Sequence, residues 1–461
     1  MRIGILPLGR PTFDIPFAEE KLAAMLEAMG RTEHEIVGPS SILVDESATR
    51  EASEALMREG IDELVILQVT FTDATMAVAA AERFDCPISI WAVPEPRGGG
   101  RLRLNAFCGL NLASHALSLR EYSFSWLYAD PGGDVDDELD SLLGGGRLAG
   151  RRDPEVTSAA FSAEGRRVAE ALRGRRIARV GAHPPGFDTC AYAADQLLEL
   201  ADIRVDELEL GRLFGAANAT TTEVLSRTRS RAEETLEGLS DLDQGQLDNS
   251  LRLKAGLDQL RVEGEYDAFA IRCWPETFTE HGGAACGPVS MMVQDKVPCA
   301  CEADVYGAVT QLLLQEAADA PVFLTDLVDV DTADNTFVVW HCGQAPVEMC
   351  DPDTVPTATV HSNRKMPLLY QFALKPGPVT FLRVSQSFNE PKMVLGFGEV
   401  LKRPLAFEGT SGVIRFEREA SAVLDDIISS GLEHHMAIAY GDHREVLRSA
   451  AAEMKLPVLE L

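Results

Sequence analysis

The chain has 461 residues, of which 46% are hydrophobic and 25% are charged. These proportions are ordinary for a soluble globular protein and exclude a disordered chain, a collagen-like chain and a disulfide-stapled mini-protein. At roughly 100–200 residues per domain, the length predicts about three domains. No run of about 18 apolar residues occurs, so we expect no membrane-spanning segment.

The net charge is strongly negative. Asp and Glu total 72 against 42 Lys and Arg, which gives −30 at pH 7. Repulsion between this charge and a polyanion argues against nucleic acid as a partner, and against an anionic membrane surface.

Cysteine usage points to a reducing compartment. There are nine cysteines, an odd number, and none forms a CxxC pair. The N-terminus reads as a first strand and lacks the apolar run and cleavage site of a signal peptide. We therefore expect a cytoplasmic protein whose cysteines are reduced and mostly buried.

The first part of the chain alternates strand and helix patterns. Such alternation predicts a parallel sheet with helices on its faces. The acidic, glycine-rich stretch Pro131–Asp153 reads as a linker or exposed excursion. We place an N-terminal α/β domain at residues 1–172. Its predicted elements, in chain order, are the strand Arg2–Leu8, the helix Phe17–Met29, the strand Leu64–Phe71, the helix Thr75–Phe84, the strand Ile88–Val93 and the helix Ala159–Leu172.

Residues 173–350 repeat the alternation and predict a central α/β domain. Its predicted strands are Arg176–Gly181, Ala268–Cys273, Val322–Leu327 and Thr336–His341. Its predicted helices are Asp188–Leu200, a charged stretch Thr222–Glu263 that is interrupted near Ser240–Gln246, and Asp304–Glu316.

Residues 351–461 change character, because short β-rich segments separated by Gly and Pro replace the alternation. A mostly antiparallel C-terminal domain is expected there. Its predicted elements are the strands Val379–Val384, Met393–Leu401 and Gly412–Phe416, the helix Ala420–Ser429 and the segment His434–Tyr440. The predicted fold class is α/β, with two doubly wound parallel-sheet domains followed by a β-rich C-terminal domain.

Several common motifs are missing or weak. The glycine runs Gly98–Gly100 and Gly144–Gly146 lack the GxGxxG register of a dinucleotide site, and neither is a Walker motif. No GxSxG elbow supports a serine hydrolase. The segment Gly181–Gly186 follows a strand and precedes a helix, and a helix N-terminus can bind an anion. We favour the simpler interpretation that this segment is an ordinary turn between the strand and the helix.

Chemistry-bearing residues gather between Arg272 and His341. Glu302 lies at a strand-to-helix junction, and Asp326 and His341 end predicted strands. Ligands of open α/β sheets bind outside the carboxyl ends of strands, and buried charges there need a partner or an ion. Alternatively, these residues are helix caps and surface acids. Their spacing alone does not decide between a functional site and this structural role.

The C-terminal pair His434 and His435 adds imidazoles beside an alternating strand. Adjacent residues of a strand point to opposite faces. We therefore expect only one of the two to face any one site.

These segments resemble the L-fucose isomerase and L-arabinose isomerase superfamily of metal-dependent aldose–ketose isomerases. The resemblance rests on four segments in order and on β-rich stretches near the C-terminus. The four are CEADVYGAVTQLLLQ, which contains Glu302, VFLTDLVDVD, which contains Asp326, VVWHCG, which contains His341, and GLEHHMAIAYGD, which contains His435; the stretches are PGPVTFLRVS and VLGFGEVL.

The resemblance implies a role for each matched residue. Glu302, Asp326 and His435 would bind a divalent cation, Mn²⁺ or Mg²⁺, and Glu302 and Asp326 would be the catalytic carboxylates. His341 would be a further ligand or a substrate contact. Trp274 and Tyr306 would pack on the sugar, with core packing as the equal alternative.

The implied reaction moves a proton between C2 and C1 of an open-chain sugar through an enediolate. One carboxylate acts as general base, an acid returns the proton, and the cation stabilises the developing charge. Either carboxylate can be the base. The substrate would be a small sugar, and an anionic substituent would suit Arg364 and Lys365 unless these are surface charges.

Two alternatives stay open. One is a metal-dependent epimerase, lyase or decarboxylase that acts on a sugar acid or modified sugar. The other is a non-catalytic sugar-binding protein. By analogy with the superfamily we expect a homo-oligomer, either a trimer or a hexamer.

Overall fold

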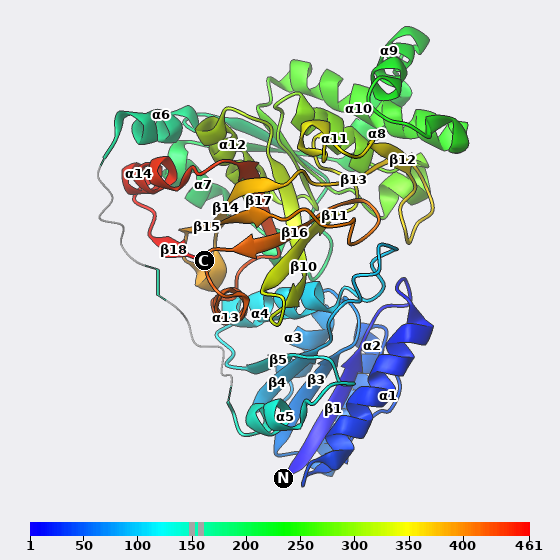
Figure 1. Ribbon diagram of the computed structural model, residues 1–461, viewed down its shortest axis with the longest axis vertical. Helices are drawn as coiled ribbons and strands as arrows, with labels where there is room; N and C mark the ends of the chain where they lie inside the picture. The colour runs from blue at the N-terminus through cyan, green and yellow to red at the C-terminus, as the bar shows by residue number, and fades with distance from the viewer. Residues whose placement is uncertain (147–152, 155–160) are drawn as a thin grey trace.

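Three β-sheets organise the protein, seen in a computed structural model that describes residues 1–146, 153–154 and 161–461 (Figure 1). The N-terminal sheet lies at one end of the molecule, and the other two sheets lie together at the opposite end. This confirms the predicted class: two parallel-sheet α/β units and a large mixed sheet. None of the helices in the described part of the chain has the length and apolar character that a membrane span needs.

The N-terminal sheet has five parallel strands in the order β2-β1-β3-β4-β5. Strand β3 is buried along its whole length, as expected for the centre of a sheet with helices on both faces. The elements of this part are β1 (Arg2–Leu8), α1 (Ile15–Arg31), β2 (Glu35–Val37), α2 (Glu46–Glu59), β3 (Glu63–Gln68), α3 (Thr75–Ala81), β4 (Ile88–Ala92), α4 (Ala106–Leu119), β5 (Ser125–Tyr128) and α5 (Asp136–Leu143).

The expected linker at Pro131–Asp153 is partly wrong. It contains α5, which buries Leu139, Leu142 and Leu143 against the N-terminal core. Residues 147–152 of the stretch, and the start of the helix predicted from Ala159, lie outside the described residues.

The central sheet has four parallel strands in the order β7-β6-β8-β9. The break predicted in the long helical stretch is confirmed, whereas the predicted helix Asp188–Leu200 is split in two. The elements are α6 (Ala163–Ala171), β6 (Arg176–Val180), η1 (Asp188–Cys190), α7 (Ala194–Ala201), β7 (Arg204–Leu208), α8 (Leu210–Asn218), α9 (Thr222–Glu233), η2 (Leu239–Asp241), α10 (Gln244–Gly264), β8 (Ala268–Ile271), η3 (Thr277–His281), α11 (Cys286–Gln294), β9 (Cys299–Cys301) and α12 (Val305–Ala318).

The third sheet has nine strands in the order β12-β13-β16-β11-β10-β17-β14-β15-β18. Strand β16 also pairs with β15, so six antiparallel strands from β16 round to β15 close into a barrel. The elements are β10 (Phe323–Asp331), β11 (Thr336–His341), η4 (Val347–Met349), β12 (Thr357–Thr359), β13 (Leu369–Ala373), β14 (Gly377–Ser385), η5 (Ser387–Asn389), β15 (Lys392–Val400), β16 (Thr410–Phe416), α13 (Ala420–Ser429), β17 (His435–Tyr440), α14 (Arg444–Met454) and β18 (Val458–Glu460).

The expected placement of two strands is wrong. Strands β10 and β11 were assigned to the central parallel sheet, but they pair antiparallel with each other and with β17 and β16 of the barrel. Their polar, turn-connected hairpin needs no crossover helix, which is typical of antiparallel pairs. The domain boundaries at residues 172 and 350 stay predictions; the sheets themselves divide between β9 and β10.

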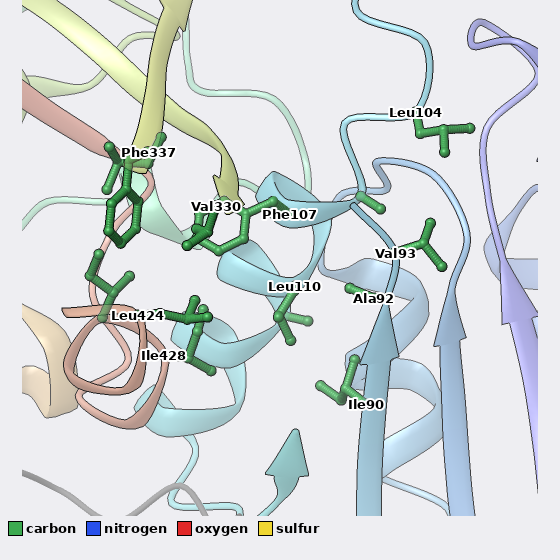
Figure 2. Packing of buried hydrophobic residues seen from close by; sticks show 14 of the residues in the cluster. Ile90, Ala92, Val93, Leu104, Phe107, Leu110, Val330, Phe337, Leu424 and Ile428 are labelled. Atoms are coloured by element: carbon green, nitrogen blue, oxygen red, sulfur yellow. The ribbon is translucent and has the colours of Figure 1, made fainter. Parts of the chain in front are cut away.

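Helix α4 joins the N-terminal sheet to the barrel. Nearly all of its residues are buried, including the polar Asn111, Ser114 and His115, because the helix packs between two layers of the molecule. Figure 2 shows Phe107 and Leu110 of α4 between Ile90 of β4 on one side and Val330 of β10 with Leu424 of α13 on the other. One hydrophobic core therefore extends from the N-terminal sheet through α4 to the barrel. It holds the N-terminal sheet against the strands that carry the site.

Candidate active site

A cavity of ≈ 130 Å³ opens where strand ends from all three sheets meet. Arg10 follows β1, Trp274 follows β8 and Glu302 follows β9, and all three line the cavity. Asp326 and His341 line it from the barrel. Because Arg10, Trp274 and Glu302 follow the carboxyl ends of β1, β8 and β9, the expectation of a site at strand ends holds for these strands of the two parallel sheets. Asp326 is an exception, since it lies inside β10 and not at its end.

Asp326, His341 and His435 form one group of buried ligand-type side chains. Each offers an atom, and these atoms lie within 4.8 Å of one another. Asp326 pairs with His435 in the register of β10 and β17, and His435 Nε2 lies 3.3 Å from Asp326 Oδ1. Asp326 Oδ1 accepts no hydrogen bond although it is buried. A carboxylate oxygen without a donor beside two imidazoles is a donor set that suits a divalent cation.

Asp304 fixes the orientation of His435. Asp304 Oδ2 lies 2.9 Å from His435 Nδ1, which therefore carries the proton and leaves the Nε2 lone pair toward Asp326. Asp304 also caps α12 by accepting the N–H of Gly307, and it accepts from Arg383 Nη1 at 2.5 Å. Burial opposes its ionisation, but Arg383 and His435 outweigh that effect and hold the pKa of the Asp304 carboxyl well below its usual range.

Arg383 is itself buried, with 1% of its side chain exposed. Its charge is balanced by Asp304 and by Glu433, whose Oε2 lies 3.8 Å from Arg383 Nε. Burial lowers the pKa of Arg383, and the two carboxylates more than reverse this, so the net shift is upward. Sequence reasoning missed the roles of Arg383 and Glu433, because neither a charge inside β14 nor a charge in the segment before β17 gives a signal of what lies opposite it.

Glu302 lies in the same cavity but outside the Asp326 group. The indole Nε1 of Trp274 donates to its Oε1 at 2.5 Å, and His434 Nε2 lies 3.7 Å from its Oε2. Burial opposes ionisation of Glu302, but these contacts and His435 outweigh it and lower the pKa of the carboxyl. The ligand set Glu302, Asp326 and His435 that the resemblance implies is therefore not the set that the structure groups: His341 takes the place of Glu302.

His341 stands beside Asp326 with its ring stacked on His435, 5.7 Å between centroids. Burial lowers the pKa of His341, but the negative charge of Asp326 prevails and raises it to about 9. A positive charge at this point, whether a proton or a divalent cation, is thus favoured by Asp326.

The expectation that only one histidine of the pair faces any one site holds for the cavity wall, which His434 lines and His435 does not. The two rings are nevertheless neighbours, with 3.9 Å between their centroids, and both histidines belong to a group with Cys190. Strand β17 begins at His435, so His434 lies before the strand and the alternation of strand side chains does not apply to it.

Two guanidinium groups line the cavity. Arg364 lies 5.3 Å from the ring centroids of both Trp274 and Phe278, and Arg10 forms an ion pair with Asp73. In the described part of the chain, Arg364 has no carboxylate within ion-pair distance. Burial lowers the pKa of Arg10 and the charge of Arg364 adds to this, so an anion beside both is electrostatically favoured.

Of the three residues predicted to contact the sugar, Trp274 and His341 line the cavity, whereas Tyr306 does not. Tyr306 packs in the core between the central sheet and the barrel, with its hydroxyl donating to Gln196. Its position in the first turn of α12 turns it away from Glu302 and into the core. Lys365 is exposed and does not line the cavity, unlike its neighbour Arg364. Arg10 was missed, although its position directly after a parallel strand is a usable signal.

Comparison with known families gives two matches. Residues 4–145 match the model of the fucose/sulfoquinovose isomerase N-terminal domain. Residues 370–461 match the model of the L-fucose isomerase C-terminal domain.

Curated relatives match over almost the whole chain. A sulfoquinovose isomerase of Priestia aryabhattai is 30% identical over 444 residues, which cover 96% of this chain and 95% of the relative. A sulfoquinovose isomerase of Clostridium sp. (strain MSTE9) is 28% identical over 461 residues, which cover 99% of this chain and 98% of the relative. An ABC-transporter periplasmic solute binding protein from Actinobacillus succinogenes 130z with bound D-allose is 12% identical, covers 68% of this chain and 90% of its own, and has a TM-score of 0.20, too low to bear on the fold.

Proposed function

Since the chain belongs to the fucose/sulfoquinovose isomerase family and is a sugar aldose–ketose isomerase, we propose that its substrate is sulfoquinovose, a hexose with a sulfonate at C6. One observation carries this proposal: the cavity that holds the Asp326 group is also lined by the guanidinium groups of Arg10 and Arg364. Family membership also removes the non-catalytic sugar-binding alternative.

The two arginines suit the sulfonate end of the sugar. Arg10 is already paired with Asp73, whereas Arg364 has no carboxylate within ion-pair distance among the described residues, so an anionic ligand would balance the charge of Arg364. Arg364 stacks over aromatic rings and leaves its N–H groups free of carboxylates, and a planar fork of donors matches the oxygens of a sulfonate. Asp73 holds Arg10 in place from the N-terminal domain.

The Asp326 group suits a divalent cation, for which we propose Mn²⁺ or Mg²⁺ held by Asp326, His341 and His435. The buried Asp326 Oδ1 without a donor is the observation that favours a cation there. When bound, such an ion acts as a Lewis acid toward the oxygens of the reacting carbons.

Glu302 is the residue that moves the proton in this proposal. The low pKa of its carboxyl keeps it ionised, as a general base must be. Its Oε2 faces His434, which is placed to share or relay a proton during transfer between C2 and C1. Asp326, grouped with the two imidazoles, then stays a ligand and not a base. Removal of the C2 proton gives an enediolate, and its return at C1 gives the ketose.

The test is product identification. Purified protein incubated with sulfoquinovose and Mn²⁺ should give sulfofructose, seen in NMR spectra as a ketose of unchanged mass. D-Glucose and L-fucose are the controls, because neither carries an anion for the two arginines. Turnover of L-fucose but not of sulfoquinovose would refute the substrate, and a product of altered mass would point to the lyase or decarboxylase alternative. The expected trimer or hexamer is checked by sedimentation velocity on the same sample.

A further inference from the structure

A second group of ligand-type side chains shares His435 with the site just described. Cys190, His434 and His435 each offer an atom, and these atoms lie within 4.8 Å of one another. All three residues are buried. Cys190 ends the short helix η1, and the two histidines lie at the start of β17. The function proposed above makes no use of Cys190.

An unpartnered nitrogen points to a ligand at this group. His434 is 3% exposed, and its Nδ1 has no hydrogen-bond partner. Buried polar atoms nearly always have a partner, so such an atom calls for an explanation. The Cys190 sulfur lies 3.9 Å from the Thr189 hydroxyl and also contacts the backbone of Glu302.

The chemistry of this group differs from that of the Asp326 group. A thiolate with two imidazoles is a soft donor set of the kind that Zn²⁺ and Cd²⁺ take. A carboxylate with two imidazoles is harder and suits Mn²⁺ or Mg²⁺. His435 therefore belongs both to a group that suits Zn²⁺ or Cd²⁺ and to a group that suits Mn²⁺ or Mg²⁺.

We propose that Cys190, His434 and His435 form a second cation site, which binds a thiophilic divalent ion such as Zn²⁺ and inhibits the enzyme. Binding exchanges the Cys190 thiol proton for the ion: the S–H bond breaks, a proton leaves to solvent and a metal–sulfur bond forms. No electron is transferred, so the process needs no oxidant.

Inhibition follows from the geometry of His435. A neutral imidazole has one nitrogen with a free lone pair. His435 directs one nitrogen to Asp304 and the other to Asp326. It cannot ligate an ion with Cys190 and keep both arrangements, so occupying the second site withdraws His435 from the Asp326 group. This consequence rests on the proposed function, whereas binding of the ion does not.

The site lies one layer behind the cavity wall. Phe187 packs against Cys190 and also lines the cavity, and its ring centroid lies 6.1 Å from that of His434. His434 lines the cavity too, so Phe187 and His434 both connect the cavity wall with the group that contains Cys190.

The binding test uses Cd²⁺ alone. Titrating Cd²⁺ into metal-free protein should produce the ultraviolet thiolate-to-cadmium charge-transfer band, and the band should be lost in Cys190→Ser. The matched control is Cys342→Ser, which removes a thiol from another part of the cavity wall and should keep the band. Loss of the band in Cys342→Ser but not in Cys190→Ser, or no band in any protein, would overturn the site.

A second measurement needs no variant. X-ray absorption of the Cd²⁺-loaded wild-type protein should show a sulfur neighbour together with nitrogen neighbours. A coordination shell without sulfur would overturn the site even if Cys190→Ser failed to fold.

The inhibitory role is tested separately with Zn²⁺ in the isomerase assay, where Mn²⁺ is held constant. Cys190→Ser should need at least a ~10-fold higher Zn²⁺ concentration for half-inhibition than the wild type, because it loses one of three ligands. Equal inhibition of both proteins would show that Zn²⁺ acts at the Asp326 group, which overturns the inhibitory role. If no sugar is turned over at all, the proposed function fails while the Cd²⁺ result stands on its own.

Discussion

Asp326 and His435 stand directly opposite each other on the antiparallel strands β10 and β17, with 3.3 Å between Oδ1 and Nε2. Residues paired in this way project on the same face of the sheet, so two residues more than a hundred positions apart belong to one group of ligand-type side chains. Asp304 holds the other nitrogen of His435, and Arg383 holds Asp304. A chain of buried contacts therefore runs from the core to the cavity.

Replacing Asp326 should weaken cation binding. Asp326→Asn removes the buried negative charge and is expected to lower the affinity for Mn²⁺ by ~10-fold or more. Calorimetric titration measures this, and the rise in melting temperature on adding Mn²⁺ should shrink in parallel. The control is Asp353→Asn, which changes a carboxylate that is 77% exposed on the surface and should leave both values as in the wild type.

Glu302→Gln separates the two roles that have been considered for this residue. If Glu302 is the base, kcat should fall by ~10²- to 10⁴-fold while the Mn²⁺ affinity stays close to that of the wild type. A variant that loses Mn²⁺ binding and activity together would instead make Glu302 a ligand, as the resemblance implies. Steady-state kinetics and calorimetry on the same preparation give both readings.

Arg364 and Lys365 form a matched pair for testing anion recognition. Arg364→Ala should raise KM for sulfoquinovose by ~10- to 100-fold, because a hydrogen bond to a charged group contributes ~1.5–3 kcal/mol. Lys365 is exposed, so Lys365→Ala should leave KM unchanged. Similar KM values for the two variants would remove Arg364 from the sulfonate site.

Arg383→Met tests the buried ion network. The substitution leaves Asp304 and Glu433 buried without their counter-charge, and we expect the free energy of unfolding to fall by ~3–5 kcal/mol. Urea denaturation measures this. Arg403→Met is the contrast, because Arg403 pairs with Asp334 at the surface and such pairs contribute ~0–1 kcal/mol. A loss for Arg383→Met as small as that for Arg403→Met would contradict the network.

Glu95 should make stability depend on pH. Its carboxylate accepts the backbone N–H groups of Arg103, Leu104 and Asn105, and burial raises its pKa from 4.5 to about 7. A raised pKa in the folded state means that the stabilisation is complete below the unfolded pKa and is lost as pH rises through about 7. The loss amounts to about 3 kcal/mol over that range.

Denaturation curves of the wild type and of Glu95→Gln, measured at several pH values from 4.5 to about 7, test this. The variant has no proton to lose, so the difference in free energy of unfolding between the two proteins should decrease as pH rises. A difference that stays constant with pH would show that Glu95 titrates normally.

The sequence by itself determined many of the strands and several residues of the site. Hydrophobic alternation predicted the central strands of the two parallel sheets and most strands of the barrel, because burial of apolar side chains at a fixed period is a local property of the chain. It did not identify helices such as α2, α4, α11 and α14. The motif segments likewise identified Glu302, Asp326 and His341, which line one cavity, and His435, which lies against Asp326.

Only the tertiary structure decided which partners these residues have. The sequence pattern assigns β10 and β11 to the central parallel sheet, whereas the structure pairs them antiparallel with each other and with β17 and β16 of the barrel. The packing of α12 against the barrel brings Arg383 to Asp304 and buries Tyr306, and the pairing of β10 with β11 groups His341 with Asp326. Such contacts join residues far apart in the chain, so their energies depend on the packing of whole sheets and leave no periodic trace in the sequence.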